Sequence, residues 1–208
     1  MNLDLVSQAQ SKAREYFRER GTMAPAAAIH SRVAEAFASL DAFLEPIAAA
    51  TAVRVGIPGE WTIQEVVDHL VETHRPGLDE LWCLFAGRRP PGEPIPASLQ
   101  SKAALVRPWS WLLGELRRVH GEILKTLAAA PADFTTDARA PLVMVVNMTD
   151  EHGAVVPLHW VEELDWKAYA ITWRLHVIDH LKQAKKVLAA TEEGGSAPLS
   201  TPPRTPLA

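Results

Sequence analysis

The chain has 208 residues, of which 48% are hydrophobic and 22% charged, with a net charge of −4 and an isoelectric point near 6.1. This length is enough for one well-filled hydrophobic core. The slightly acidic balance offers no basic surface to a phosphate backbone, so we expect no nucleic acid partner. No apolar run approaches the roughly 18 residues needed to cross a bilayer, and residues 1–10 lack the hydrophobic core of a signal peptide. We therefore expect no membrane partner and a cytoplasmic location.

Two helices are predicted in the first 50 residues. Residues 1–20 have the pattern of a short amphipathic helix that ends at Gly21. A second helix is expected from about residue 23 to residue 50, because apolar side chains recur there at helical spacing: Ile29, Val33, Ala36, Phe37, Leu40 and Leu44. The glycines and the proline of 51–60 predict a loop.

A capping box marks the start of the next helix. The hydroxyl of Thr62 can accept from the backbone N–H of Glu65, whose carboxylate can reach back to Thr62. His69 borders the apolar stripe of the helix that follows. Pro76 is expected to kink or restart this helix, which then continues to Gly87.

The remaining segments predict two more long helices and one hairpin. A short helical stretch at 98–106 precedes a helix expected from about residue 109 to residue 130. Two segments rich in β-branched residues, 142–148 and 154–161, flank the turn sequence TDEHG and predict a β-hairpin. The last helix is expected from about residue 163 to residue 190.

These elements predict an all-α fold, a four-helix bundle, with one small β-hairpin before its last helix. The bundle would occupy residues 22–190, and residues 1–21 would form an N-terminal helical extension. Prolines and small residues in 191–208 predict a disordered tail.

Two histidines of the last helix, His176 and His180, are four residues apart. This spacing places both side chains on one helix face, with their Cβ atoms about 5–6 Å apart. The same face is apolar, and a buried imidazole needs a partner for each ring nitrogen. One metal ion would satisfy both rings. The alternative is a pair of core histidines bonded to other side chains, because so short a motif occurs widely.

His69 adds a third candidate ligand from a different helix. Facing helices of a bundle can bring such side chains within ligand distance. Three histidines would leave coordination positions open, as in catalytic rather than structural sites. A distance of more than about 8 Å from the His69 imidazole to both other rings would exclude a shared ion. A simple packing role is the alternative for His69.

The other five histidines are not expected to be ligands. His74 is expected at the rim of the site rather than as a fourth ligand. His30 and His120 are expected to be solvated, and His152 should be exposed in the hairpin turn. His159, at the entry to the last helix, is a candidate for the mouth of the site.

Aromatic residues precede the histidine pair at helical spacing on the last helix. Trp166 is expected to pack in the core. Tyr169 and Trp173 lie seven and three residues before His176 and should form the wall above the metal. There they would offer a hydroxyl and an indole N–H to a bound ligand or cofactor.

Two stretches together resemble the DinB/YfiT-like family of metalloenzymes. GEWTIQEVVDHLVE at 59–72 has a Trp-Thr helix start and a histidine seven residues after the threonine. WRLHVIDHLKQAKKV at 173–187 has a histidine pair followed three residues later by Gln183. The order of the helices also fits, and the resemblance covers about residues 23–190. The run after the pair departs from the Arg-Gly-Gln-like sequence common in the family.

The resemblance implies a four-helix bundle in which His69, His176 and His180 are the metal ligands. We expect one divalent transition metal, with zinc or nickel favoured and iron or copper as alternatives. An ion held by three imidazoles is a Lewis acid that can activate a water molecule or a thiol.

Characterised branches of the family include transferases and isomerases that use low-molecular-weight thiols such as bacillithiol or mycothiol. The leading hypothesis is therefore a metal-dependent enzyme with a small-molecule substrate, namely a thiol-dependent S-transferase acting on a small electrophile. A non-catalytic module that binds metal or small ligands is the competing hypothesis. We also expect a homodimer, because proteins of this type often pair through their helices and Trp109 and Trp111 could form an exposed aromatic patch.

Overall fold

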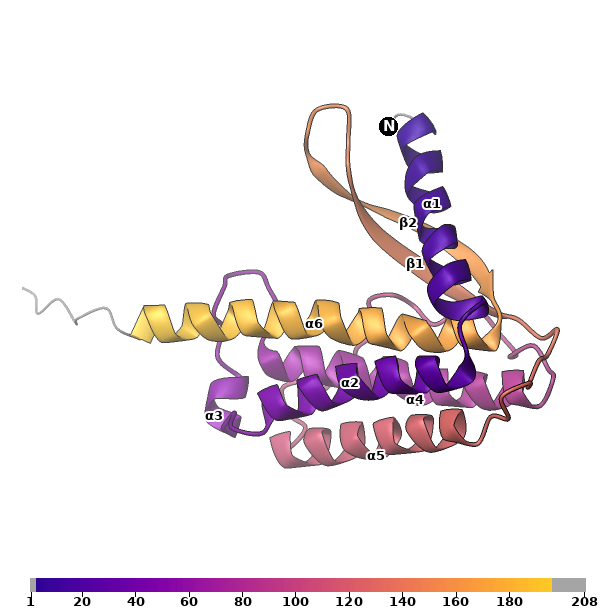
Figure 1. The fold of residues 1–208 in the computed structure, drawn as a ribbon. Helices are drawn as coiled ribbons and strands as arrows, with labels where there is room; N and C mark the ends of the chain where they lie inside the picture. Colours follow the sequence, from indigo (N-terminus) through magenta and orange to yellow (C-terminus); the bar gives the residue numbers. More distant parts are fainter. Residues whose placement is uncertain (1–2, 196–208) are drawn as a thin grey trace, which may run out of the picture.

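The structure, a computed structural model, describes residues 3–195. Four long helices form its body: α2 (Ala26–Leu44), α4 (Ile63–Phe85), α5 (Trp109–Ala128) and α6 (Trp166–Gly195). They lie side by side as a bundle, and α1 (Leu3–Phe17) rises with a β-hairpin from the end at which α6 begins (Figure 1). The predicted four-helix bundle with one small hairpin is confirmed. Among the described residues no helix is long and apolar enough to cross a membrane.

The N-terminal extension is tied to the bundle through a close backbone contact. After α1 the chain makes one π-helical turn, η1 (Arg18–Thr22). A Cβ atom at Gly21 would lie 2.6 Å from the Cα of Ala168, so only glycine lets η1 approach α6 this closely. The extension is therefore anchored at its C-terminal end, and α1 extends from there.

The segment predicted as one helix from 23 to 50 is divided in the structure. α2 ends at Leu44, and a single turn, α3 (Ala49–Ala52), follows after Pro46. The proline ring cannot supply a backbone N–H and blocks continuation of the helix. The sequence prediction of an uninterrupted helix was therefore wrong at this point.

The capping box at the start of α4 is present as predicted. The backbone N–H of Thr62 donates to the carboxylate of Glu65 at 2.7 Å, and the N–H of Glu65 donates to the Thr62 hydroxyl at 3.2 Å. Pro76 does not restart the helix, which runs without a break through Phe85. A proline inside a helix costs about 3 kcal/mol, because it removes one hydrogen bond and its ring crowds the preceding turn. Burial of Gly77, Leu78 and further apolar residues beyond the proline offsets this cost.

The hairpin pairs β1 (Ala140–Thr149) with β2 (Val155–Leu164) in antiparallel register. Its turn is closed by Asp150, whose carboxylate accepts from the backbone N–H groups of His152 and Ala154 at 2.8 Å each. β2 runs through Leu164, and α6 begins at Trp166, so the last helix starts later than predicted.

The core lies between the four long helices. Trp166 is 2% exposed in this core, as predicted, and Trp109 is 8% exposed and donates its indole N–H to the carbonyl of Ile47. The expected exposed patch therefore contains Trp111 but not Trp109. α6 includes residues 191–195 of the predicted tail, and residues 196–208 of that tail lie outside the described residues.

Candidate metal centre

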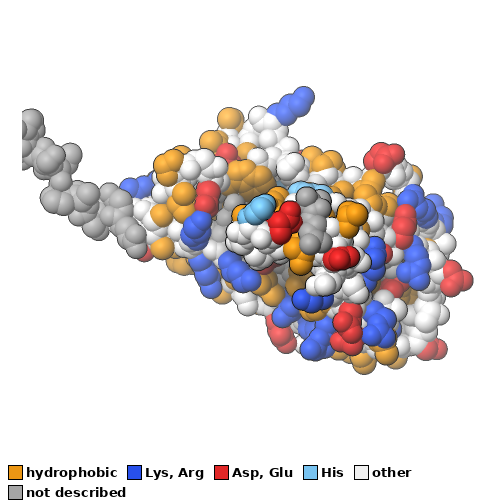
Figure 2. Space-filling model, turned by 90° about the horizontal axis from the view of Figure 1, so that it is seen from above, with side chains coloured by type: hydrophobic (Ala, Val, Ile, Leu, Met, Phe, Trp, Pro, Cys, Tyr) orange, Lys and Arg blue, Asp and Glu red, His pale blue; other side chains and the backbone are white. Residues whose placement is uncertain are grey.

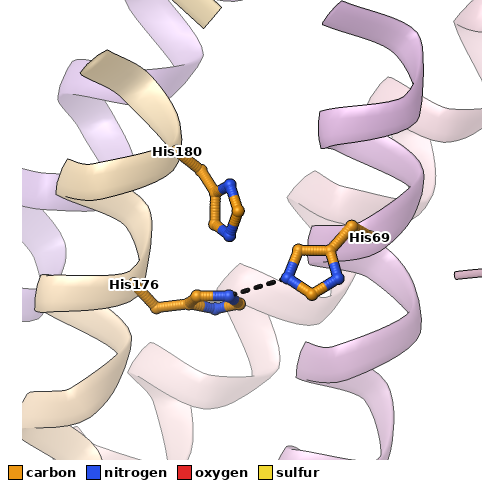
Figure 3. Close-up of side chains that lie close together, drawn as sticks. All are labelled: His69, His176 and His180. Atoms are coloured by element: carbon orange, nitrogen blue, oxygen red, sulfur yellow. Dashed lines mark hydrogen bonds between the residues drawn. The ribbon is translucent and has the colours of Figure 1, made fainter. Parts of the chain in front are cut away.

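Three imidazoles meet where α4 and α6 face each other. His69 projects from α4, and His176 and His180 project from α6 toward it (Figure 3). One potential ligand atom from each ring lies within 4.8 Å of the other two. The ring centre of His69 lies 5.0 Å from that of His176 and 4.6 Å from that of His180. The predicted convergence of the three rings is therefore present, well inside the limit for a shared ion.

The ring of His69 is fixed in one tautomer by the backbone. Its Nδ1 lies 2.7 Å from the carbonyl oxygen of Leu99. A carbonyl only accepts, so Nδ1 carries the hydrogen and Nε2 of the neutral ring keeps its lone pair. This Nε2 lies 2.9 Å from Nε2 of His176. His69 is 1% exposed, so its lone pair points into a sheltered space between the helices.

A buried carboxylate holds the loop that orients His69. Asp68, which is fully buried, accepts from the backbone N–H and the hydroxyl of Ser101 at 2.8 and 2.7 Å. It also pairs with the guanidinium of Arg107 at 3.1 Å. These contacts hold the carbonyl of Leu99 against His69. The short helix predicted at 98–106 does not form, because this segment makes turns that bond to α4 instead.

His180 is oriented by its own helix and by one tryptophan. Its Nδ1 lies 2.9 Å from the side-chain oxygen of Gln183, one turn further along α6. This contact leaves Nε2 free to face the other two rings. The indole of Trp61 stacks on His180 with ring centres 6.0 Å apart and also contacts His69 at 5.0 Å. Trp61 thus covers one side of the cluster.

His176 belongs to a longer row of histidines than the sequence indicates. Its Nδ1 lies 3.0 Å from Nε2 of His74, and Nδ1 of His74 lies 3.0 Å from Nε2 of His120. His74 is 1% exposed and His120 is 7% exposed and stacks on Phe37. The predictions of a rim position for His74 and a solvated His120 were therefore wrong. Four-residue spacing from Leu116, a buried residue of α5, is the sequence feature that could have placed His120 inward.

The remaining histidines take no part in the cluster. His152 is exposed in the hairpin turn, as predicted, and His30 is partly exposed on α2. His159 is exposed on β2, and it is not among the residues that line the cavity beside the cluster.

The clustered imidazoles are held in their neutral form. Burial, together with the nearby His180, lowers the pKa of His69 to about 4, although the hydrogen bond to Leu99 opposes the shift. Burial also lowers the pKa of His176 well below 6.5 and that of His120 to about 3. Neutral imidazole is the form that binds metal ions, since its ring nitrogen then offers a lone pair. The donor set therefore fits a divalent transition metal.

A cavity of about 1000 Å³ lies between α1, β1 and α6, and His176 and His180 form part of its wall. The view from above shows hydrophobic side chains close to histidines on this face of the molecule (Figure 2). Most of the lining is apolar: it includes Leu5, Ala9, Phe17, Leu142, Met144 and Val146.

Tyr169 and Trp173 also line this cavity, so both lie beside the cluster. The hydroxyl of Tyr169 donates to the carboxylate of Glu80, which is 9% exposed. Burial raises the pKa of Glu80, and burial together with Glu80 raises that of Tyr169. This hydroxyl therefore has a structural partner, and a role in binding a ligand or cofactor stays a prediction for both aromatic residues.

Comparison with known proteins supports the architecture. The family model described as DinB superfamily matches residues 32–184, which is more than half of the chain. A similar solved structure is that of YfiT from Bacillus subtilis, described as a probable metal-dependent hydrolase with an unusual four-helix bundle topology. The two sequences are 17% identical, and the match covers 83% of this chain and 89% of the YfiT chain. The TM-score is 0.52, so the likeness is one of fold alone. No protein with curated function matches significantly.

Proposed function

The chain belongs to the DinB superfamily, and on this premise we propose that it is a metal-dependent enzyme that acts on a small molecule. The observation that carries the proposal is the meeting of three neutral imidazoles, two of which, those of His176 and His180, line an apolar cavity of about 1000 Å³. A metal site buried without access would favour a structural role instead.

His69, His176 and His180 would hold a divalent transition metal through their Nε2 atoms. When bound, such an ion supplies a Lewis acid that lowers the pKa of a water molecule or a thiol. Zinc or nickel suits three neutral imidazoles, and iron or copper is an alternative. The carbonyl of Leu99 and the amide oxygen of Gln183 fix two of the three rings before any ion binds.

The first candidate reaction is transfer of a low-molecular-weight thiol to a small electrophile. In it the thiol sulfur forms a bond to an electrophilic carbon, the leaving group departs with the bonding electrons, and the thiol proton passes to solvent. The apolar lining contributed by α1 and β1 supports a substrate with an apolar body and limits the access of water, which would compete with the thiol. Hydrolysis is the second candidate, favoured by the description of YfiT as a probable metal-dependent hydrolase.

A paired assay tests the proposal. The metal-loaded protein is incubated with 1-chloro-2,4-dinitrobenzene and bacillithiol or mycothiol, and separately with 4-nitrophenyl esters and no thiol. Formation of the thioether supports the transferase, and release of 4-nitrophenol alone supports the hydrolase. Either activity should be lost on chelation and in His176→Ala, and retained in His152→Ala, which removes an exposed histidine. A protein that binds metal but turns over neither class of substrate would favour a non-catalytic binding module.

A further inference from the structure

A line of three imidazoles crosses the bundle from the metal centre. It begins at His176 on α6, passes through His74 on α4, and ends at His120 on α5, with nitrogen–nitrogen distances of 3.0 Å at both steps. His74 and His120 are both buried. Phe37 stacks on His120 with ring centres 3.6 Å apart and planes within 8°, which fixes the ring at the far end.

The hydrogens along this line must all point the same way. His74 and His120 are buried, and the ring nitrogens lie 3.0 Å apart at both contacts, so a charged imidazole here would lose its hydration beside another ring; we therefore treat the rings as neutral. A neutral imidazole has one N–H group and one lone pair. Each contact between rings needs one hydrogen, so the direction chosen at one contact determines the direction at the next.

Two arrangements of hydrogens meet this condition. In the first, the three rings of the line carry their hydrogens on Nε2, and His176 donates to the Nε2 lone pair of His69. In the second, every ring carries its hydrogen on Nδ1, so that His176 donates to His74 and His74 donates to His120. Only the second leaves the Nε2 lone pair of His176 available to an ion.

The second arrangement also gives each ligand its own acceptor at Nδ1. The carbonyl of Leu99 accepts from His69, and the side-chain oxygen of Gln183 accepts from His180. His74 is the corresponding acceptor for His176. Acceptors of this kind orient the ligand ring and raise its basicity.

We propose that His74 and His120 are positioning residues of the metal centre, which hold His176 as an Nε2 ligand by accepting the hydrogens of the second arrangement. This inference rests on the metal site of the proposed function. In the metal-bound protein the rings of His176, His74 and His120 carry their hydrogens on Nδ1. In the metal-depleted protein the same three rings carry them on Nε2.

Protons balance in the change between the two arrangements. One proton leaves Nε2 of His176 to solvent, and His176 receives one at Nδ1 from Nε2 of His74. His74 receives one at Nδ1 from Nε2 of His120, and His120 takes one at Nδ1 from water. Every ring stays neutral. The hydrogen positions therefore change on three helices without placing a charge on a buried imidazole.

Nuclear magnetic resonance can read these hydrogen positions directly. The full chain labelled with ¹⁵N-histidine is recorded with excess chelator and then with one equivalent of zinc, using long-range ¹H–¹⁵N spectra that distinguish Nδ1–H from Nε2–H. Zinc should move the hydrogen of His120 from Nε2 to Nδ1. If zinc changes the three ligand rings while His120 keeps its hydrogen on Nε2, the proposal is overturned. If zinc changes no histidine, the metal site and the proposed function fail instead.

Zinc affinity gives a second, independent readout. His74→Phe should bind zinc about 10–100-fold more weakly in competition with a chromophoric chelator, because His176 loses its acceptor. His74→Gln should restore most of the affinity, since its amide can accept from His176 and donate to His120. His152→Gln, in the exposed hairpin turn, is the matched control and should bind as the unaltered chain does. Equal affinity of the Phe and Gln variants would overturn the proposal, and if His74→Phe fails to fold, the spectra decide.

Discussion

Replacing Asp68 with alanine should weaken the fold and the metal centre together. The carboxylate is fully buried and accepts two hydrogen bonds from Ser101, and its third partner, Arg107, keeps a contact with Glu72 at 2.7 Å. Each hydrogen bond to a charged group contributes about 1.5–3 kcal/mol, and breaking a buried ion pair costs about 3–5 kcal/mol. Because Arg107 retains a partner, the two lost hydrogen bonds set the cost, and we expect the free energy of unfolding to fall by about 3–6 kcal/mol.

The same substitution should lower zinc affinity about 10–100-fold, because Leu99 would no longer be held against Nδ1 of His69. Urea unfolding of the chelated protein measures the first effect, and competition with a chromophoric chelator measures the second. Asp41→Ala is the matched control, since it removes an exposed ion pair with Arg117 and should cost less than about 1 kcal/mol. A stability loss in Asp68→Ala as small as in this control, or unchanged zinc affinity, would refute the reasoning.

Two further predictions concern buried side chains, and a third concerns the expected association of two chains. Tyr169→Phe leaves the buried carboxyl of Glu80 without its donor, so the free energy of unfolding should fall by about 1–3 kcal/mol. The metal content should stay unchanged, and loss of the metal would contradict a place for Tyr169 outside the set of ligands. The pKa of His120 is lowered to about 3 in the folded chain, so the unfolded chain binds more protons between pH 3 and 6.5 and stability falls as pH drops through this range. In urea unfolding, the decrease in the free energy of unfolding between pH 6.5 and 5 should be smaller by roughly 2 kcal/mol in His120→Gln than in the unaltered chain. An identical dependence on pH in the two proteins would contradict this prediction. Finally, we propose that the chain forms a homodimer, whose mass by light scattering at tens of micromolar should be twice the 22.8 kDa of one chain. A monomer mass would exclude a tight dimer.

The fold was accessible from the sequence because its main features are local. The capping box at Thr62 and the helical recurrence of apolar residues in α2, α4 and α6 depend on spacing within one element. Helix ends were less predictable where they depend on neighbours. The continuation of α4 past Pro76 rests on packing against other helices, which no short stretch of sequence records.

The candidate site was also predictable only in the part that depends on local sequence or on the family resemblance. The pair His176 and His180 follows from helical spacing, and the resemblance to a family of metalloenzymes added His69. The partners of these rings come from segments distant in the chain: Leu99 lies 30 residues from His69, and His120 lies 46 residues from His74. Contacts of this kind depend on the relative placement of helices. The spacing from Leu116 could therefore indicate that His120 faces inward, but not that it contacts His74.

Metal analysis of the purified full chain tests the central claim most directly. After loading with zinc or nickel and removal of excess ion, elemental analysis should find about one ion per chain, with imidazole nitrogen as the protein ligand in X-ray absorption spectra. His69→Ala and His180→Ala should each lose most of this metal, and His152→Ala should keep it. An unaltered chain that retains no metal, or variants of His69 and His180 that retain it in full, would contradict the account.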